Sequence, residues 1–161
     1  MWLFIIPVVC LKRREFFMNN HEDERVFDEI MEFLRQLEWP AEPLSKKIVR
    51  TFYSGDFGVS EVIIHISTQD VCMVIDPVVE NHGSCWGDAV LRLVSAMSEE
   101  IQHIGIGIDS DGDLFVKVHL PLEHVNLERF HCLLLGLCQV AENMILPVLQ
   151  ANAFDHLKEL A

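Results

Sequence analysis

Residues 103–120, HIGIGIDSDGDLFVKVHL, constrain the fold more than any other stretch of this chain. Isoleucine alternates with glycine in the first half, and apolar residues alternate with Phe115, Lys117 and His119 in the second half. Such alternation is typical of strands that bury one face, and residues 109–112 between the halves have the composition of a turn. The segment therefore predicts an antiparallel hairpin, and with it a sheet that covers a core.

Three strand-like runs precede this hairpin, over residues 46–54, 59–68 and 71–76. They are rich in β-branched residues, and short turn sequences separate them. In the second run, Ile63 interrupts an otherwise polar face. Consecutive strands joined by tight turns indicate an antiparallel meander.

Apolar residues at helical spacing predict helices over residues 22–37, 85–101 and 126–146. Asn126 is a suitable N-cap for the last helix, and Pro147 marks its end or a kink, with a further turn or two in the tail. The predicted order is α-β-β-β-α-β-β-α. We therefore expect a single domain of the α+β class, with an antiparallel sheet packed against helices.

The charge balance of the chain limits its partners. It has 25 acidic and 12 basic residues among 161, a net charge of −13. Nucleic acid and membrane surfaces rich in anionic lipid would repel such a protein, so we expect neither as a partner. A basic or hydrophobic protein is compatible with this charge. The five cysteines form no CxxC pair, which favours reduced thiols and a cytoplasmic location.

Residues 1–17 differ in character from the rest of the chain. An apolar run comes first and positive charges follow it, the reverse of a secretory signal, and the run is too short to span a bilayer. The tripeptide Arg13-Arg14-Glu15 is what an AGGAGG-type ribosome-binding sequence encodes in frame, and Met18 follows it closely. We expect residues 1–17 to be a non-native extension and residues 18–161 to be the domain. The alternative is a disordered or apolar segment that lies on a membrane surface or packs on the domain.

No sequence motif predicts catalysis. The tetrapeptide GSCW around Cys85 matches the nucleophile signature of papain-like proteases, but the chain ends too early for the His and Asn expected about 130–150 residues later. Residues 109–113, DSDGD, lack the Gly and Glu positions of a calcium-binding EF-hand. The eight histidines show no zinc-binding spacing. We therefore expect no catalytic residue, cofactor or metal site, and keep Cys85 as a candidate reactive thiol near a helix N-terminus.

Residues 112–142, GDLFVKVHLPLEHVNLERFHCLLLGLCQVAE, carry a resemblance to a known family. A Gly-Asp turn leads into a strand that ends in Leu-Pro-Leu, and a helix follows with Phe near its start and Ala-Glu further on. In this pattern the chain resembles the YbjN-type bacterial proteins, which share the fold of class I type III secretion chaperones, over about residues 22–150. The resemblance implies a soluble, often dimeric, non-enzymatic protein that binds other polypeptides or acts in regulation. It transfers no fixed functional residue.

Two sets of residues are candidates for a partner or dimer surface. Leu135 and Leu146 lie on the outer side of the last helix, where either a neighbouring loop or another chain covers them. Gly105 and Gly107 leave a bare strip on one sheet face, which another backbone could approach. The leading hypothesis is a cytoplasmic bacterial binding module, chaperone-like or regulatory, which forms a homodimer and binds a protein partner. The alternative is a thiol-based redox or hydrolytic protein that uses Cys85.

Overall fold

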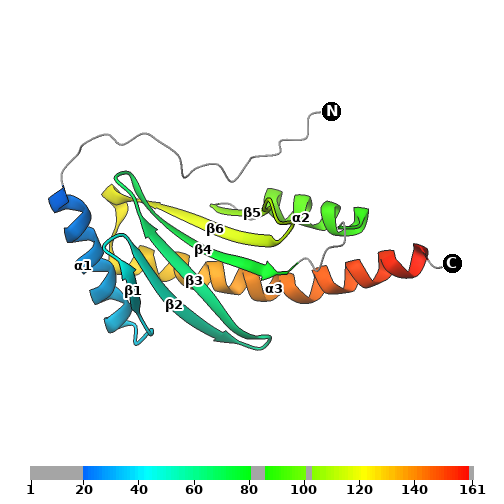
Figure 1. Ribbon diagram of the computed structural model, residues 1–161, viewed down its shortest axis with the longest axis horizontal. Helices are drawn as coiled ribbons and strands as arrows, with labels where there is room; N and C mark the ends of the chain where they lie inside the picture. The colour runs from blue at the N-terminus through cyan, green and yellow to red at the C-terminus, as the bar shows by residue number, and fades with distance from the viewer. Residues whose placement is uncertain (1–19, 81–85, 101–102, 160–161) are drawn as a thin grey trace.

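The computed structural model of the protein describes residues 20–80, 86–100 and 103–159 (Figure 1). In chain order its elements are α1 (Asn20–Gln36), β1 (Glu42–Ser45), β2 (Ile48–Gly55), β3 (Gly58–Ile66), β4 (Asp70–Val79), α2 (Asp88–Glu100), β5 (Ile104–Ile108), β6 (Leu114–Pro121), the short 3-10 helix η1 (Leu122–His124) and α3 (Leu127–Glu159). The α+β class and the predicted order of helices and strands are confirmed. The short strand β1 is an addition that the sequence pattern did not predict.

All strands belong to one antiparallel sheet with the order β1-β2-β3-β4-β6-β5. The predicted meander forms β2 to β4, and the predicted hairpin adds β6 beside β4, with β5 at the edge. At the hairpin turn, Oδ1 of Asp109 accepts hydrogen bonds from the backbone N–H groups of Asp111 and Asp113, at 2.8 and 2.9 Å. Gly112 has φ +90°, which glycine adopts without strain. The DSDGD stretch is therefore a hairpin turn, as its composition predicts.

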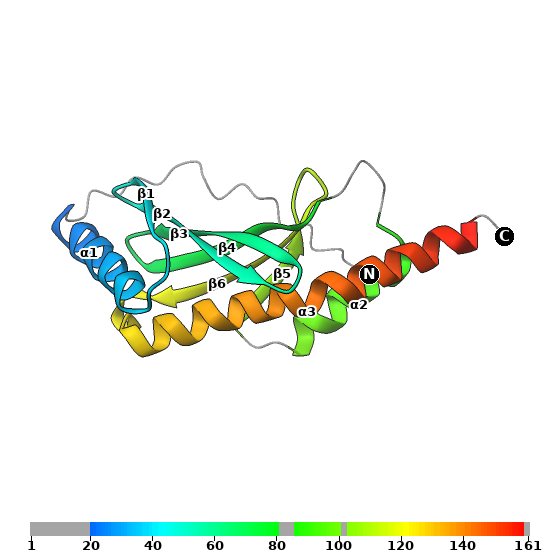
Figure 2. The same ribbon diagram turned by 90° about the horizontal axis from the view of Figure 1, so that it is seen from below.

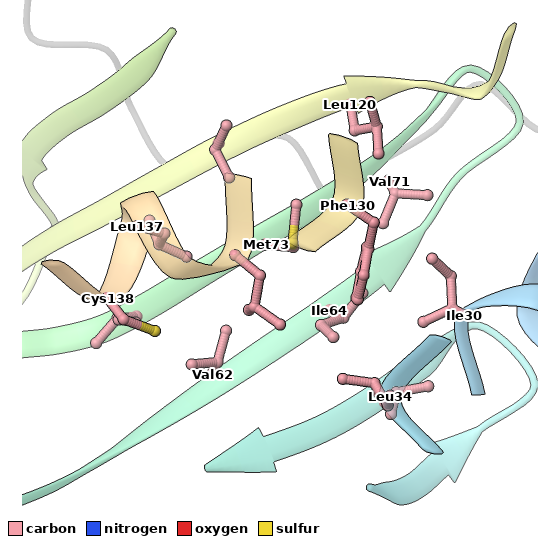
Figure 3. Packing of buried hydrophobic residues seen from close by; sticks show 14 of the residues in the cluster. Ile30, Leu34, Val62, Ile64, Val71, Met73, Leu120, Phe130, Leu137 and Cys138 are labelled. Atoms are coloured by element: carbon pink, nitrogen blue, oxygen red, sulfur yellow. The ribbon is translucent and has the colours of Figure 1, made fainter. Parts of the chain in front are cut away.

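One face of the sheet packs against α1 and α3 and forms the main core (Figure 2). Figure 3 shows Ile30 and Leu34 of α1 close to Ile64 of β3, with the Phe130 ring of α3 beside them. The helical residues in this core recur three or four positions apart, so they share one stripe on each helix. Their burial removes apolar surface from water, which is the main stabilising contribution to a fold of this kind.

A second, smaller cluster joins α2 to α3 and the sheet. Val90 and Val94 of α2 pack with Leu114 of β6 and Val148 of α3. The indole Nε1 of Trp86 donates a 2.6 Å hydrogen bond to the carbonyl of Gly112 in the β5–β6 turn. This cluster is what holds α2 against the end of the sheet.

The prediction that α2 begins at Cys85 was wrong, because the helix begins at Asp88. The carbonyl of Gly87 accepts the first helical hydrogen bond, from the N–H of Leu91 at 3.1 Å, so Gly87 is the N-cap. Trp86 lies outside the helix, where its indole reaches the β5–β6 turn. Cys85 itself lies outside the described residues.

The helix α3 continues through Pro147 to Glu159, although proline was expected to end or kink it. Pro147 has no N–H to give the preceding turn, which normally costs a helix stability. Val148 is fully buried in the cluster with α2, so tertiary packing offsets the missing hydrogen bond. Over its 33 residues the helix is about 50 Å long, and its last turns extend past the sheet (Figure 2).

By length and composition alone, Leu127–Ala153 of α3 could cross a membrane. Within that stretch, however, Phe130, Leu134, Leu137 and Met144 are fully buried in the domain core. An apolar helix that fills a protein core passes the same test of length and composition. The packing therefore accounts for the apolar character of the core-facing positions of α3.

Candidate functional site

The sheet has a second face, which points away from the helices (Figure 2). Within residues 20–80, 86–100 and 103–159, no helix packs over this surface, which we call the open face. The side chains on it include Ile48, Arg50, Phe52, Ile63, His65, Cys72, Val74, Phe115, Lys117 and His119, all half-buried except His119, which is exposed. Val59 and Glu61 of β3 lie on the same face and are exposed. The open face is thus a mixed surface of apolar, charged and histidine side chains.

An apolar pair lies at the centre of the open face, between two cations. The strand register places Arg50 opposite Ile63, Ile63 opposite Val74, and Val74 opposite Lys117. These residues form one row across β2, β3, β4 and β6. Side chains directly opposite on neighbouring strands are in contact range, so the row is continuous.

Aromatic rings support both cations of this row. The Arg50 guanidinium lies 5.6 Å from the centre of the Phe52 ring, and the Lys117 ammonium lies 5.6 Å from that of Phe115. Arg50 also donates to Glu42 at 2.7 Å, and this hydrogen bond raises the pKa of its guanidinium. Glu61 lies 3.5 Å from the same guanidinium, so Arg50 is paired with two carboxylates, while Lys117 lies over the Phe115 ring.

Beside this row lies a cluster that joins a thiol, an imidazole and a carboxylate. The Sγ atom of Cys72 is 3.8 Å from Nε2 of His119, and Nδ1 of His119 is 2.7 Å from Oδ2 of Asp70. The Ser67 hydroxyl donates to the other oxygen of Asp70 at 2.6 Å. His65 lies opposite Cys72 on β3, and His119 lies opposite it on β6. We call Asp70, Cys72 and His119 the thiol cluster.

The charges of the thiol cluster follow from its hydrogen bonds. Burial raises the pKa of Asp70, but the hydrogen bonds from Ser67 and His119 outweigh this and lower that pKa below its usual value. Asp70 is therefore a carboxylate at neutral pH, and Nδ1 of His119 donates the hydrogen bond to it. The lone pair of a neutral His119 then lies on Nε2, which faces Cys72. Burial and the Asp70 charge raise the pKa of Cys72, so its thiol is protonated.

The thiol cluster has the layout of a nucleophile, a base and a group that orients the base. However, Cys72 is the third residue of β4, which pairs with β3 on one side and β6 on the other. The backbone N–H groups around it are used in these ladders, whereas acyl transfer needs N–H donors free to stabilise an oxyanion. In the described part of the chain, the cluster therefore lacks a component that hydrolysis requires.

Other features of an enzyme or metal site are also missing from the parts of the chain that the structure describes. No three His, Cys, Asp or Glu side chains there are arranged around a common point that could hold a metal ion as they stand. The two best-formed hollows are shallow grooves along α1, lined by residues such as Glu24, Arg25 and Glu32. Neither groove borders the thiol cluster.

The structure places the predicted partner residues in different environments. Gly105 and Gly107 lie on the open-face side of β5. The strip that they form was expected to be bare, but side chains of β6 cover it. A Cβ atom added to Gly107 would lie 2.7 Å from the Phe115 ring, and one added to Gly105 would lie 3.4 Å from the Lys117 side chain. The glycines thus make room for side chains of the neighbouring strand β6.

The two predicted leucines both belong to α3. Leu135 is half-buried, and the side chain of Leu146 lies outside the described residues, as does Cys85. The role of Leu135 and Leu146 in a partner surface and the role of Cys85 as a reactive thiol stay predictions. Among the described residues, the large apolar side chains that are exposed are Leu44, Phe57, Val59, Leu91 and Leu149.

The thiol cluster could not be recognised in the sequence pattern. Asp70 and Cys72 lie in or next to the third predicted strand run, and His119 lies in the hairpin, far along the chain. Their proximity depends on the pairing of β4 with β6, two strands separated by α2 and β5. The alternation of residues 114–120 predicts that Lys117 and His119 share one face of a strand. It does not predict which other strand pairs with that one.

Comparisons with known proteins bear on the fold of the chain. No protein-family model matches the chain, and no curated protein matches it significantly. Among solved structures, a chain from the crystal structure of the ExsC–ExsE complex is similar, with a TM-score of 0.55 and 17% sequence identity. The match covers 73% of this chain and 89% of that chain. The predicted type III secretion chaperone-like fold is thereby confirmed, and at this identity the likeness shows the fold alone.

Proposed function

We propose that this protein is a non-enzymatic binding module of the bacterial cytoplasm, chaperone-like or regulatory, which holds a segment of a protein partner against the open face. The observation that carries the proposal is the row Arg50, Ile63, Val74 and Lys117, an apolar centre between two cations on an uncovered sheet face. The fold supports it, because the similar chain comes from a complex of two proteins.

The composition of the open face defines the kind of segment that fits it. Half-buried Ile63 and Val74 lose their remaining water contact only if another apolar group covers them. Lys117 at one end of the row favours an acidic group on the partner, whereas Arg50 at the other end is already paired with Glu42 and Glu61. The expected segment is therefore apolar at its centre and acidic on the flank that lies over Lys117. Aromatic and arginine side chains, both present here, are the types that contribute most to binding at protein interfaces.

The homodimer is a second part of the proposal, and it concerns a different surface. Leu91 of α2 and Leu149 of α3 are 45% and 48% exposed, and the two helices pack against each other. An apolar patch that such leucines form together on neighbouring helices is typical of a surface that another chain covers. Leu135 and Leu146 remain candidates for the same surface, since both belong to α3.

Membership of the YbjN-type family is a narrower proposal within this fold. Residues 112–142, which carry that resemblance, form the end of the β5–β6 turn, β6, η1 and the first half of α3. The order of a strand, a Leu-Pro-Leu segment and a helix in these residues supports this proposal. A thiol-based activity of Cys85 falls outside the described residues, and no described contact supports it.

The test is a pull-down from the native organism with tagged wild-type protein and two variants. Val74→Asp puts a charge at the centre of the open face, and Gln139→Glu puts a charge at an exposed position of α3, which packs on the opposite face of the sheet. Wild-type and Gln139→Glu proteins are expected to recover one companion in fixed ratio, and Val74→Asp is expected to lose it. Far-UV circular dichroism checks that both variants fold. A wild-type bait without a companion, or one whose companion survives Val74→Asp, would overturn the proposal.

A further inference from the structure

We infer that His65 and His119 make the binding of an acidic segment to the open face depend on pH, so that acidification strengthens it. This pH dependence rests on the proposed function, because it concerns the same surface and the same kind of partner. It adds the side chains that contact the acidic flank of the segment and the condition under which they attract it.

The two histidines belong to a second row across the open face. The strand register places Ile48 opposite His65, His65 opposite Cys72, and Cys72 opposite His119. This row lies beside the one that ends at Lys117, two residues further along each strand. One imidazole therefore lies on each side of Cys72, next to the apolar centre of the open face.

The spacing of Lys117 and His119 fits an extended acidic segment. The two residues are two positions apart on the same face of β6, and a strand rises about 3.3 Å per residue, so they are about 7 Å apart. Residues i and i+2 of an extended partner have the same spacing. Carboxylates at two such positions of the partner can therefore lie over Lys117 and His119 together.

The His119 imidazole is held in place and remains accessible. Its Nδ1 lies 2.7 Å from Oδ2 of Asp70, and the side chain is 50% exposed. His65 is close enough to act on the same carboxylate. Burial raises the pKa of Asp70, whereas the hydrogen bonds from Ser67 and His119 and the charges of His119 and His65 lower it. A charge on either imidazole is thus felt within one small patch.

The other charged groups of this patch come from β4 and β6. Asp70 is a carboxylate at neutral pH, and Lys117 carries a positive charge. The Cys72 thiol is protonated and neutral, because burial and the Asp70 charge raise its pKa. With neutral imidazoles, Lys117 and Asp70 therefore offset each other.

The charges on the surrounding elements are paired among themselves. Arg50 of β2 lies 2.7 Å from Glu42 and 3.5 Å from Glu61. Beyond the end of β6, Glu123 and His124 of η1 lie 3.5 Å apart. The net charge next to Lys117 is therefore set mainly by the two imidazoles.

Histidine is the side chain whose charge changes between about pH 5 and pH 8. Protonation of His65 and His119 adds two positive charges beside Lys117, while the carboxylates of a partner stay ionised down to about pH 5. The bound state then favours the protonated imidazoles, so affinity rises as the pH falls and is lost as the pH rises. Exposed charge pairs are individually weak, so we expect an increase of about three- to tenfold.

The test measures how the full chain binds two rhodamine-labelled peptides, by fluorescence anisotropy at about pH 8 and about pH 5.5 in low salt. The acidic peptide is Ile-Val-Ile-Val-Glu-Ser-Glu, and its neutral counterpart has Gln in place of both Glu residues. The acidic peptide is expected to bind about three- to tenfold more tightly at the lower pH, and the neutral peptide equally at both. High salt should remove the difference, because it screens exposed charges.

Variants assign the effect to the two histidines. The double variant His65→Gln/His119→Gln should lose the pH dependence. The matched control His131→Gln, on α3 at the opposite face of the sheet, should keep it. Circular dichroism checks that both variants fold, and the comparison of the two peptides on the wild type needs no variant.

The outcomes separate this inference from the proposed function. Binding of the acidic peptide with equal affinity at both pH values, or a pH dependence that survives in the double variant, overturns the inference and leaves the proposed function standing. If neither peptide binds at either pH, both are overturned.

Discussion

Among the residues that the structure describes, Thr51 of β2 is the one polar residue that is fully buried. Its hydroxyl donates a 2.6 Å hydrogen bond to the carbonyl of Pro40, across the loop that follows α1. No buried side-chain nitrogen or oxygen is left without a partner in that part. Thr51 therefore ties the end of α1 to the sheet without leaving an unsatisfied group in the core.

Replacing Thr51 by Val should lower the free energy of unfolding by about 1 kcal/mol, the net value of a typical internal hydrogen bond. Urea denaturation measures this directly. Thr68→Val is the matched control, because Thr68 is exposed in the β3–β4 turn and its replacement should change stability by less than about 0.5 kcal/mol. Equal effects of the two substitutions would contradict the role of the buried hydroxyl.

Asp70 and Asp76 should give opposite dependences of stability on pH. The pKa of Asp70 is lowered by Ser67 and His119 against the opposing effect of burial, so its carboxylate stabilises the fold above the unfolded-state pKa of about 3.9. That contribution is lost as the pH falls through the folded-state pKa. Asp70→Asn should therefore be less stable than wild type at neutral pH, with a difference that shrinks in acid.

Burial raises the pKa of Asp76, and the charges of Asp109, Asp113 and Asp111 raise it further. In this case the ionised carboxylate destabilises the fold above the folded-state pKa, and the penalty disappears as the pH falls below the unfolded-state value. Asp76→Asn should thus be more stable than wild type at neutral pH, with an advantage that fades in acid. Denaturation of the wild type and both variants from about pH 7 to about pH 3 measures these changes in stability. If both substitutions changed the stability at neutral pH in the same direction, the prediction would be wrong.

At the level of single elements, α3 is the main support of the sheet. Leu134 is fully buried in the core, whereas Leu149 on the same helix is 48% exposed. Leu134→Ala should reduce the free energy of unfolding by about 2–5 kcal/mol, through lost burial and the cavity that remains. Leu149→Ala should change it by less than about 0.5 kcal/mol. Urea denaturation of both variants checks the pair, and a large loss in Leu149→Ala would place that residue in a packed interface.

The elements with regular apolar spacing were predictable from the sequence, and their ends were not. The hairpin, the meander and the three helices follow from alternation and helical periodicity. Strand β1 was missed because its four residues are all exposed and include Pro43, which an edge strand tolerates since it need not donate on the solvent side. The helix α3 continues past Pro147 because Val148 packs against α2, and a local sequence pattern does not predict that tertiary contact.

On the scale of the whole molecule, the class and order of the fold could be predicted, but the site could not. The open face brings together residues of β2, β3, β4 and β6, and β6 joins β4 only after α2 and β5 intervene. Ile63 was visible as an apolar residue on a polar face, yet its neighbours Val74 and Lys117 depended on the strand order. Glycines at 105 and 107 were misread as a bare strip because the Phe115 and Lys117 side chains that cover them come from the partner strand.

The central claim is that a protein partner covers the open face, and amine labelling of Lys117 tests it most directly. The labelling rate is measured by mass spectrometry for the free protein and for the complex with the companion recovered in the pull-down. Lys46 serves as the internal control, since its side chain is 83% exposed and lies in the β1–β2 turn. The companion is expected to slow the labelling of Lys117 and to leave that of Lys46 unchanged. Equal labelling of Lys117 in the free and bound protein would contradict it.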